Sequence, residues 1–161
     1  MNLAAKPLQM PVDGRQSETA LRIARGTARL LHALGRCVVS ELGLPAGRRA
    51  DLVALDAGGE IWIVEIKSSV ADFRADQKWQ AYRAHCDRLF FATGLEVPCE
   101  IFPPDTGLIV ADAFGAQMMC EAPEHRLPAA TRKAMMLIFA RAAAARLQSL
   151  ADPAGPYGDI D

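Results

Sequence analysis

The sequence lacks a long apolar run of the kind that crosses a membrane. The longest run, from Ala134 to Ala140, ends at Arg141, whereas a membrane-spanning helix needs roughly 18 apolar residues. Residues 1–16 contain a single lysine and no continuous apolar segment, so they predict no secretory signal. We therefore expect no membrane partner.

The chain also has few cysteines, and their spacing argues against two common uses. They form no CxxC pair and have no nearby histidine at the spacing of metal ligands. This pattern does not favour a disulfide framework or a zinc site and predicts reduced, half-buried thiols. Together with the lack of a signal segment, it predicts a cytoplasmic protein. The four cysteines are Cys37, Cys86, Cys99 and Cys120.

The net charge is small, −1 in total, which by itself does not favour a nucleic-acid partner. The charge is unevenly distributed, however. Residues 1–50 hold eight basic and three acidic side chains (net +5), residues 51–88 five and seven (net −2), and residues 89–161 five and nine (net −4). The positive charge lies in the first helix and in Arg48 and Arg49. Such asymmetry can form a phosphate-facing surface on a nearly neutral chain.

Length and composition fit one globular domain with a real core. The 161 residues are 51% hydrophobic and 23% charged, an ordinary profile for a domain of this size. We expect a single domain over residues 15–151, between flexible tails at residues 1–14 and 152–161.

Hydrophobic periodicity and turn residues predict elements in the order α-β-β-β-α-β, followed by two short strands and a closing helix. The glycines in residues 56–60 predict a tight hairpin, because glycine adopts the positive φ that such turns need. A helix between the third and fourth strands implies a parallel pair in an otherwise antiparallel sheet. The fold class is therefore α/β with a mixed sheet. We expect helices at residues 17–34, 69–86 and 128–150, and strands at 37–42, 50–55, 61–67, 89–93, 107–111 and 117–121.

The third predicted strand, Ile-Trp-Ile-Val-Glu-Ile-Lys, has an unusual pattern. Its first residues are apolar on both faces, which predicts a central strand. Alternation assigns Trp62, Val64 and Ile66 to one face. Glu65 and Lys67 then share the other face, near the end of the strand. Ionised groups in such a position need a partner or a metal.

Asp51 begins the second strand, and the hairpin brings it beside Glu65 and Lys67. Two carboxylates form a hard-oxygen site for Mg²⁺ or Mn²⁺, and the backbone carbonyl of Ile66 can complete the metal ligands. A metal there polarises a phosphate, while the Lys67 ammonium orients the attacking water or stabilises charge on phosphorus. The structural alternatives are a Glu65–Lys67 salt bridge and a pairing of Asp51 with a neighbouring arginine.

The pattern D-x₁₃-E-x-K on a hairpin between two helices resembles the PD-(D/E)xK nuclease superfamily, which has the restriction-endonuclease-like fold. More closely, GRRADLVAL, IVEIKSSVADFRADQKW and CDRLFFA are similar to the MmcB family of bacterial DNA-repair proteins, best over residues 36–93. Ala50 departs from the proline that precedes the aspartate in the superfamily motif. The resemblance implies a metal-dependent DNA nuclease, with Asp51, Glu65 and Lys67 as catalytic residues.

The resemblance also suggests further site residues. A third acid from an upstream element is common in the superfamily, which makes Glu41 a catalytic candidate, evenly balanced against a structural role. Related nucleases use a glutamine, lysine or tyrosine of the second helix near the water or a phosphate. Gln80 is therefore a catalytic candidate and Lys78 a DNA-binding one, with Tyr82 left undecided. Independently, Arg48 and Arg49 can anchor the phosphodiester backbone or be simply solvated.

The favoured interpretation is a divalent-metal phosphodiesterase that acts on DNA in repair. The second interpretation is a non-catalytic DNA-binding module on the same fold. The third is a scaffold domain whose E-x-K is an ion pair and whose closing helix docks a second copy or a repair protein. The methionines near Met135 are interpreted as core residues, with a dimer surface as the alternative.

Overall fold

The structure is a computed structural model and describes residues 16–156. The predicted tail at residues 1–14 lies outside this range, as do residues 157–161 of the second predicted tail. The elements are α1 (Glu18–Ala33), β1 (Cys37–Gly43), β2 (Arg49–Leu55), β3 (Ile61–Lys67), α2 (Val70–Ala75), the 3₁₀ helix η1 (Trp79–His85), β4 (Arg88–Thr93), the 3₁₀ helix η2 (Cys99–Ile101), β5 (Gly107–Ala111), β6 (Ala116–Cys120) and α3 (Ala129–Ala151).

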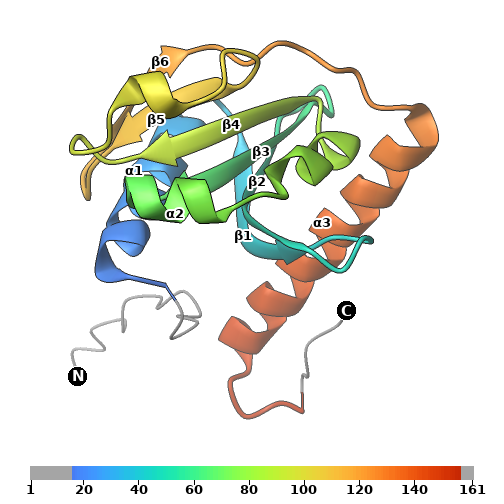
Figure 1. Cartoon of the computed structure of the whole chain (residues 1–161). Coiled ribbons are helices and arrows are strands. Elements are labelled where there is room, and N and C mark those ends of the chain that lie inside the picture. The colour runs from blue at the N-terminus through green and yellow to red at the C-terminus, as the bar shows by residue number, and fades with distance from the viewer. Residues whose placement is uncertain (1–15, 157–161) are drawn as a thin grey trace, which may run out of the picture.

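The six strands form one mixed sheet in the order of the sequence, which confirms the predicted α/β class (Figure 1). The pairs β1–β2, β2–β3 and β5–β6 are antiparallel, and β3–β4 is parallel as predicted. The pair β4–β5 is also parallel, which was not predicted from the sequence. The proline-rich link, which contains η2, returns the chain to the start of β5 and therefore acts as a second crossover.

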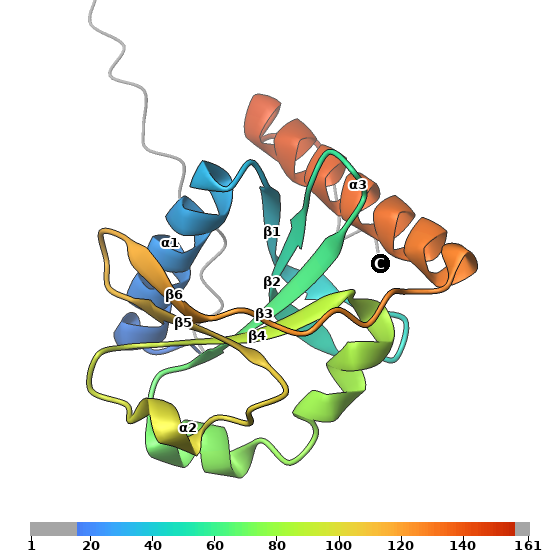
Figure 2. The ribbon, with the colours of Figure 1, turned by 90° about the horizontal axis from the view of Figure 1, so that it is seen from above.

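Helices cover both faces of this sheet. Figure 2 shows α1 and α3 on opposite sides of it. All seven residues of β3 are buried, as expected for a central strand. Trp62, Val64 and Ile66 pack in the cluster that contains α1 side chains, whereas Ile61 and Ile63 pack in the cluster that contains α3 and η1 side chains. The predicted alternation of β3 is therefore confirmed.

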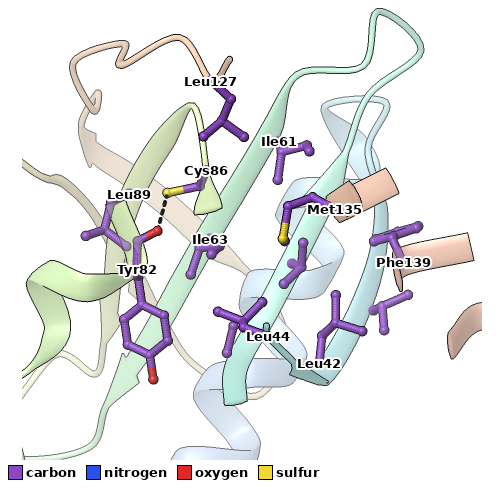
Figure 3. Close-up of a cluster of buried hydrophobic side chains, with 13 residues drawn as sticks. Leu42, Leu44, Ile61, Ile63, Tyr82, Cys86, Leu89, Leu127, Met135 and Phe139 are labelled. Atoms are coloured by element: carbon purple, nitrogen blue, oxygen red, sulfur yellow. Dashed lines mark hydrogen bonds between the residues drawn. The ribbon is translucent and has the colours of Figure 1, made fainter. Parts of the chain in front are cut away.

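The α3 helix packs on the sheet through buried Met135 and Phe139, four residues apart, with Ile138, Ala142 and Ala143 partly buried beside them. Met135 and Phe139 are 1% and 8% exposed and contact the β-sheet cluster shown in Figure 3. Burying side chains of this size contributes about 1.5–3 kcal/mol each. Most of the helix is exposed, and by length and composition alone it could span a membrane, which is weak evidence. The absence of a membrane partner stays a prediction.

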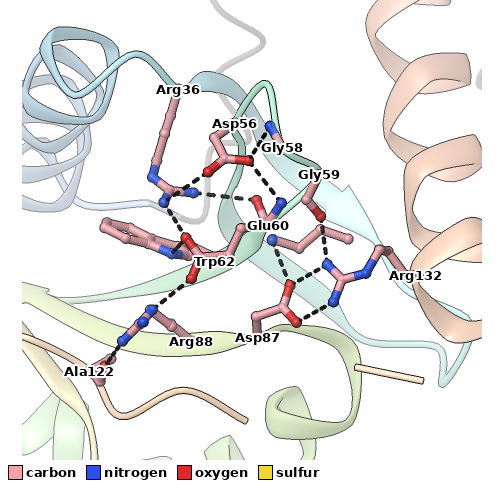
Figure 4. A network of polar contacts seen from close by, with 11 residues as sticks. Arg36, Asp56, Gly58, Gly59, Glu60, Trp62, Asp87, Arg88, Ala122 and Arg132 are labelled. Carbon is pink, nitrogen blue, oxygen red and sulfur yellow. Dashed lines mark hydrogen bonds and ion pairs between the residues drawn. The ribbon is translucent and has the colours of Figure 1, made fainter. Parts of the chain in front are cut away.

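A polar network joins α3 to the turn of the β2–β3 hairpin (Figure 4). This turn lies at the end of β2 opposite to Asp51. Asp87, 1% exposed, accepts two hydrogen bonds from the Arg132 guanidinium, both at 2.7 Å. Its carboxylate also accepts from the backbone amides of Ile61 and Leu127. The hairpin turn has the predicted glycine conformation, with Gly59 at φ +84°. These contacts hold the starts of β3 and β4 in place, at the end of the sheet opposite to Glu65 and Lys67.

One predicted element is wrong. The single helix expected over residues 69–86 is broken into α2 and η1. The break lies at Asp76, whose Oδ1 accepts from the Lys78 amide at 3.0 Å and whose Oδ2 accepts from Lys67 Nζ at 2.6 Å. An aspartate that bonds the amide two residues ahead offers the backbone a turn in place of the helix. The ion pair with β3 stabilises that choice.

Candidate active site

Three acidic residues lie level with one another on adjacent strands. The β1–β2 ladder skips only Glu41, which is therefore opposite Asp51. The β2–β3 ladder ends at Leu52 and Val64, one step before Asp51 and Glu65. The strands thus form a row Glu41–Asp51–Glu65 at the carboxyl end of β3. Such rows place side chains within interaction distance across strands.

Asp51 and Glu65 are joined by reciprocal hydrogen bonds rather than by the sheet ladder. The Asp51 amide donates to Glu65 Oε1 at 3.2 Å, and the Ile66 amide donates to Asp51 Oδ2 at 2.7 Å. Each carboxylate therefore accepts from a backbone amide on the strand that carries the other carboxylate. The predicted proximity of the two acids is borne out by these contacts.

Burial and mutual repulsion make both acids hard to ionise. Burial raises the pKa of Asp51 to about 6, with a further increase from the charge of Glu41, although the Ile66 amide opposes the change. Burial, followed by the charge of Asp51, raises the pKa of Glu65 well above its usual range. Glu65 is only 4% exposed. A buried and a half-buried carboxylate that both resist ionisation favour the binding of a cation.

The Lys67 ammonium forms an ion pair with Asp76, not with Glu65. Nζ lies 2.6 Å from Asp76 Oδ2, and the lysine is 5% exposed. The charge of Lys67 still lowers the pKa of both Asp51 and Glu65, so the ammonium is close to the acids. Asp76 was not predicted as the partner of Lys67, because the pairing depends on the tertiary structure and no local pattern in the sequence identifies it.

Glu41 lies beside Asp51 in an unusual backbone conformation. It has φ +50°, the only positive φ of a non-glycine residue among residues 16–156. Its side chain pairs with Arg49, whose Nε is 2.5 Å from Oε2, and accepts from the Gln16 side chain at the start of α1. A strained residue held by several contacts is typical of functional sites. The structure therefore brings this third acid to the site.

Of the candidates after β3, Tyr82 comes closest to the acids. Its hydroxyl donates to the Arg49 carbonyl at 3.0 Å. Burial, followed by the charges of Glu65 and Asp51, raises its pKa. The Arg48 guanidinium lies 5.7 Å from the centre of its ring. Tyr82 thus holds the segment that immediately precedes Asp51.

Gln80 and Lys78 lie on the surface. Both side chains are exposed, and none of the contacts in the described part of the chain joins either side chain to the acids. Arg48 is half-buried and Arg49 is exposed. These two arginines flank the site because they lie three and two residues before Asp51 in the sequence, whereas Lys78 lies at its margin.

The donor set suits a small hard cation. Within residues 16–156, no group of three or more histidine, cysteine, aspartate or glutamate side chains is already arranged to hold a metal ion. Asp51 and Glu65 nevertheless supply two carboxylates, and the Ile66 carbonyl lies on the same strand end. Mg²⁺ is commonly bound through one or two carboxylates and keeps several waters. The residues present therefore fit such an ion.

Comparisons with known proteins agree with the sequence resemblance. No curated protein matches the chain. A solved structure, the SPO1766 protein of unknown function from Silicibacter pomeroyi, is 45% identical and has a TM-score of 0.85. The match covers 91% of this chain and 99% of that one.

The family model described as DNA repair protein MmcB-like matches residues 8–154. This match spans nearly the whole chain, including every element of the sheet and the acids at its edge. The predicted family is therefore confirmed, while membership of the PD-(D/E)xK superfamily stays a prediction. The chain belongs to the MmcB-like family of DNA repair proteins.

Proposed function

We propose that this protein is a divalent-metal-dependent DNA nuclease that acts in repair. The observation that carries the proposal is the pair of half-buried Asp51 and buried Glu65, whose carboxylates have raised pKa values and each accept a backbone amide from the other's strand. Burying two like charges is costly unless a cation compensates them. A divalent cation compensates both at once.

Asp51 and Glu65 would hold Mg²⁺ or Mn²⁺, with the Ile66 carbonyl as a further ligand. When bound, such a cation polarises the scissile phosphate and makes a water easier to ionise. Lys67 is buried beside these acids and carries an ammonium that can stabilise charge building on the phosphate or orient the water. If the Lys67 ammonium left Asp76, or contacted Asp76 and the substrate together, it would reach the phosphate.

Arg48 and Arg49 would hold the phosphodiester backbone. They lie three and two residues before Asp51, and Tyr82 fixes this segment through the Arg49 carbonyl. Arginine contacts to phosphates position a nucleic acid without reading its sequence. Glu41, through its pair with Arg49, would orient that arginine and add negative charge beside the metal.

The second candidate is a DNA-binding module without catalysis. The observation that favours it is the Lys67–Asp76 ion pair, which engages the one ammonium that the nuclease needs. In this case the arginines still bind phosphate, whereas the acids shape the fold. A scaffold role, with the exposed part of α3 as the docking surface, is supported by Leu137 and Leu147, which are 55% and 68% exposed.

Cleavage assays distinguish these functions. Single-stranded, duplex, flap and junction DNA are incubated with wild type in Mg²⁺, Mn²⁺ or EDTA at low salt, where phosphate contacts are strongest. We expect metal-dependent cleavage that is lost in Asp51→Asn and Glu65→Gln and retained in Asp105→Asn, an exposed acid outside the site. Binding without cleavage of any form would support the second candidate instead.

A further inference from the structure

The loop between β5 and β6 displays an aromatic side chain to solvent. Phe114 is 81% exposed, and it lines a hollow of about 600 Å³ together with Leu95 and Met119, which are 79% and 54% exposed. Large apolar side chains gathered in an open hollow mark a binding surface more often than isolated ones do. The feature lies outside the proposed active site.

Hydrogen bonds and a close approach to α1 hold the backbone of this loop. Asp112 Oδ1 accepts from the amides of Phe114 and Gly115 at 2.7 and 2.9 Å, and Arg29 donates to the Phe114 carbonyl at 2.9 Å. Gly26 of α1 lets the loop approach the helix directly, since a Cβ there would overlap the backbone oxygens of Asp112 and Gly115. These contacts fix the backbone of the Phe114 loop against α1, and the Phe114 side chain there is exposed.

An arginine stripe on α1 leads to this aromatic ring. Arg22, Arg25 and Arg29 are spaced three and four residues apart, so they share one exposed face of the helix. Arg22 pairs with Glu18, whereas Arg25 forms no ion pair or side-chain hydrogen bond within residues 16–156. Arg29 contacts the Phe114 loop itself. Figure 2 shows α1 alongside β5 and β6.

The hollow lies at the same end of the sheet as the proposed active site, beside the carboxyl ends of β4 and β5. The strand register aligns Lys67 with Thr93 and Thr93 with Val110, and the hollow begins at the neighbouring Gly94 and Ala111. Two strand spacings separate β3 from β5, about 10 Å. A stacked DNA strand advances about 3.4 Å per nucleotide. About three nucleotides therefore span the distance between β3 and β5.

From these features we propose that the α1 arginine stripe and Phe114 bind single-stranded DNA, with one base stacked on the Phe114 ring. The arginines supply charge for the phosphates, and the hollow accepts an unpaired base. Positive grooves with exposed aromatic rings are the general means of binding single strands. A base inside a duplex has no free face to stack. The inference deepens the proposed function by naming an unpaired segment as the substrate class.

The test measures binding by fluorescence anisotropy, with labelled oligothymidylate and a duplex of equal length in EDTA. Wild type is expected to bind the single strand about tenfold or more tightly than the duplex. Phe114→Ala should weaken single-strand binding about tenfold, while Phe114→Trp retains it. Arg25→Gln should reduce the salt slope by about 0.7, the value for one phosphate contact to a single strand.

Two exposed positions on α3 provide matched controls, Leu147→Ala for the aromatic variant and Arg141→Gln for the arginine variant. Neither should change binding, and all variants should melt like wild type. Equal affinity for single strand and duplex, or unchanged binding by Phe114→Ala, would overturn the inference. A dimer that Phe114→Ala dissociates without changing DNA binding would also overturn it and identify a second copy as the occupant. Binding is measured in EDTA, which removes the metal that the proposed cleavage needs. The binding result can therefore be interpreted even if the nuclease proposal fails.

Discussion

Asp51 and Glu65 exchange backbone hydrogen bonds across β2 and β3, through the amides of Asp51 and Ile66. The sheet ladder stops at the preceding pair, Leu52 and Val64. Beyond it, the two side-chain carboxylates accept the backbone amides that carbonyl groups accept within the ladder. This arrangement holds half-buried Asp51 beside buried Glu65, where both acids resist ionisation. It is the basis of the predictions on metal binding and pH.

Metal should stabilise the native state through this pair. A ligand that binds only the native protein raises its stability by mass action, about 2.7 kcal/mol at a hundredfold excess over Kd. Mn²⁺ or Mg²⁺ should therefore raise the melting temperature of wild type by several degrees. Differential scanning fluorimetry with and without metal measures this change.

The double variant Asp51→Asn/Glu65→Gln is the control for that experiment. It keeps the shape of both side chains and one acceptor oxygen on each but removes their charge, so its melting temperature should not respond to metal. An equal rise in wild type and double variant would assign the metal to another part of the protein.

Without metal, stability should fall as the pH rises through the range in which Asp51 ionises. Its pKa is about 6 in the folded protein, above the unfolded value of about 3.9. The stability contributed by the protonated form is therefore fully present below about pH 4 and is lost through pH 6. Glu65, whose pKa is also raised, extends the loss to higher pH.

Urea denaturation in EDTA across this pH range measures the effect. As the pH rises through this range, the free energy of unfolding of wild type should fall by on the order of 2–3 kcal/mol relative to that of Asp51→Asn. Parallel stability curves for the two proteins would mean that Asp51 ionises normally and is not a desolvated metal ligand.

Arg132 should be needed for stability rather than activity. Arg132→Met leaves the Asp87 carboxylate, which is 1% exposed, without its ionic partner. Removing one member of a buried pair costs about 3–5 kcal/mol, and the melting temperature should fall by roughly 10 °C. Arg141→Met, an exposed position on the same helix, should have little effect. A loss below about 1 kcal/mol would show that the network in Figure 4 is not a stabilising one.

The sequence predicted much of the fold because hydrophobic alternation and glycine turns act locally. β3 and β5 have the predicted bounds, and the N-cap Ser17 of α1 accepts from the Ala20 amide as capping requires. The broken helix after β3 could not be predicted in the same way. Asp76 interrupts it by pairing with Lys67, a contact that depends on the tertiary structure.

The candidate site was partly predictable for a similar reason. A short hairpin fixes the register, so Asp51 and Glu65 could be paired from their spacing alone. Tyr82 could not be distinguished from Gln80 or Lys78, because the break at Asp76 changes which side of the segment faces the sheet. The exposure of Phe114 depends on the close approach of α1 at Gly26, which no local pattern reveals.

The central claim is that two acids hold a metal and a separate lysine acts on the substrate. Lys67→Met keeps most of the aliphatic stem but removes the ammonium. It should still bind Mn²⁺, more tightly if anything, because a nearby positive charge is gone. Its cleavage rate should fall by roughly 10²-fold or more, the scale for loss of one preorganised electrostatic group. Asp76→Asn, which frees Lys67 from its ion pair, should retain cleavage.

The most direct test combines Mn²⁺ titration by calorimetry with DNA cleavage for wild type, Lys67→Met and Glu65→Gln under one set of conditions. We predict that wild type binds and cleaves, Lys67→Met binds without efficient cleavage, and Glu65→Gln does neither. Cleavage by Lys67→Met at the wild-type rate would make the buried lysine a structural partner of Asp76 and contradict the assignment of this site as a nuclease centre.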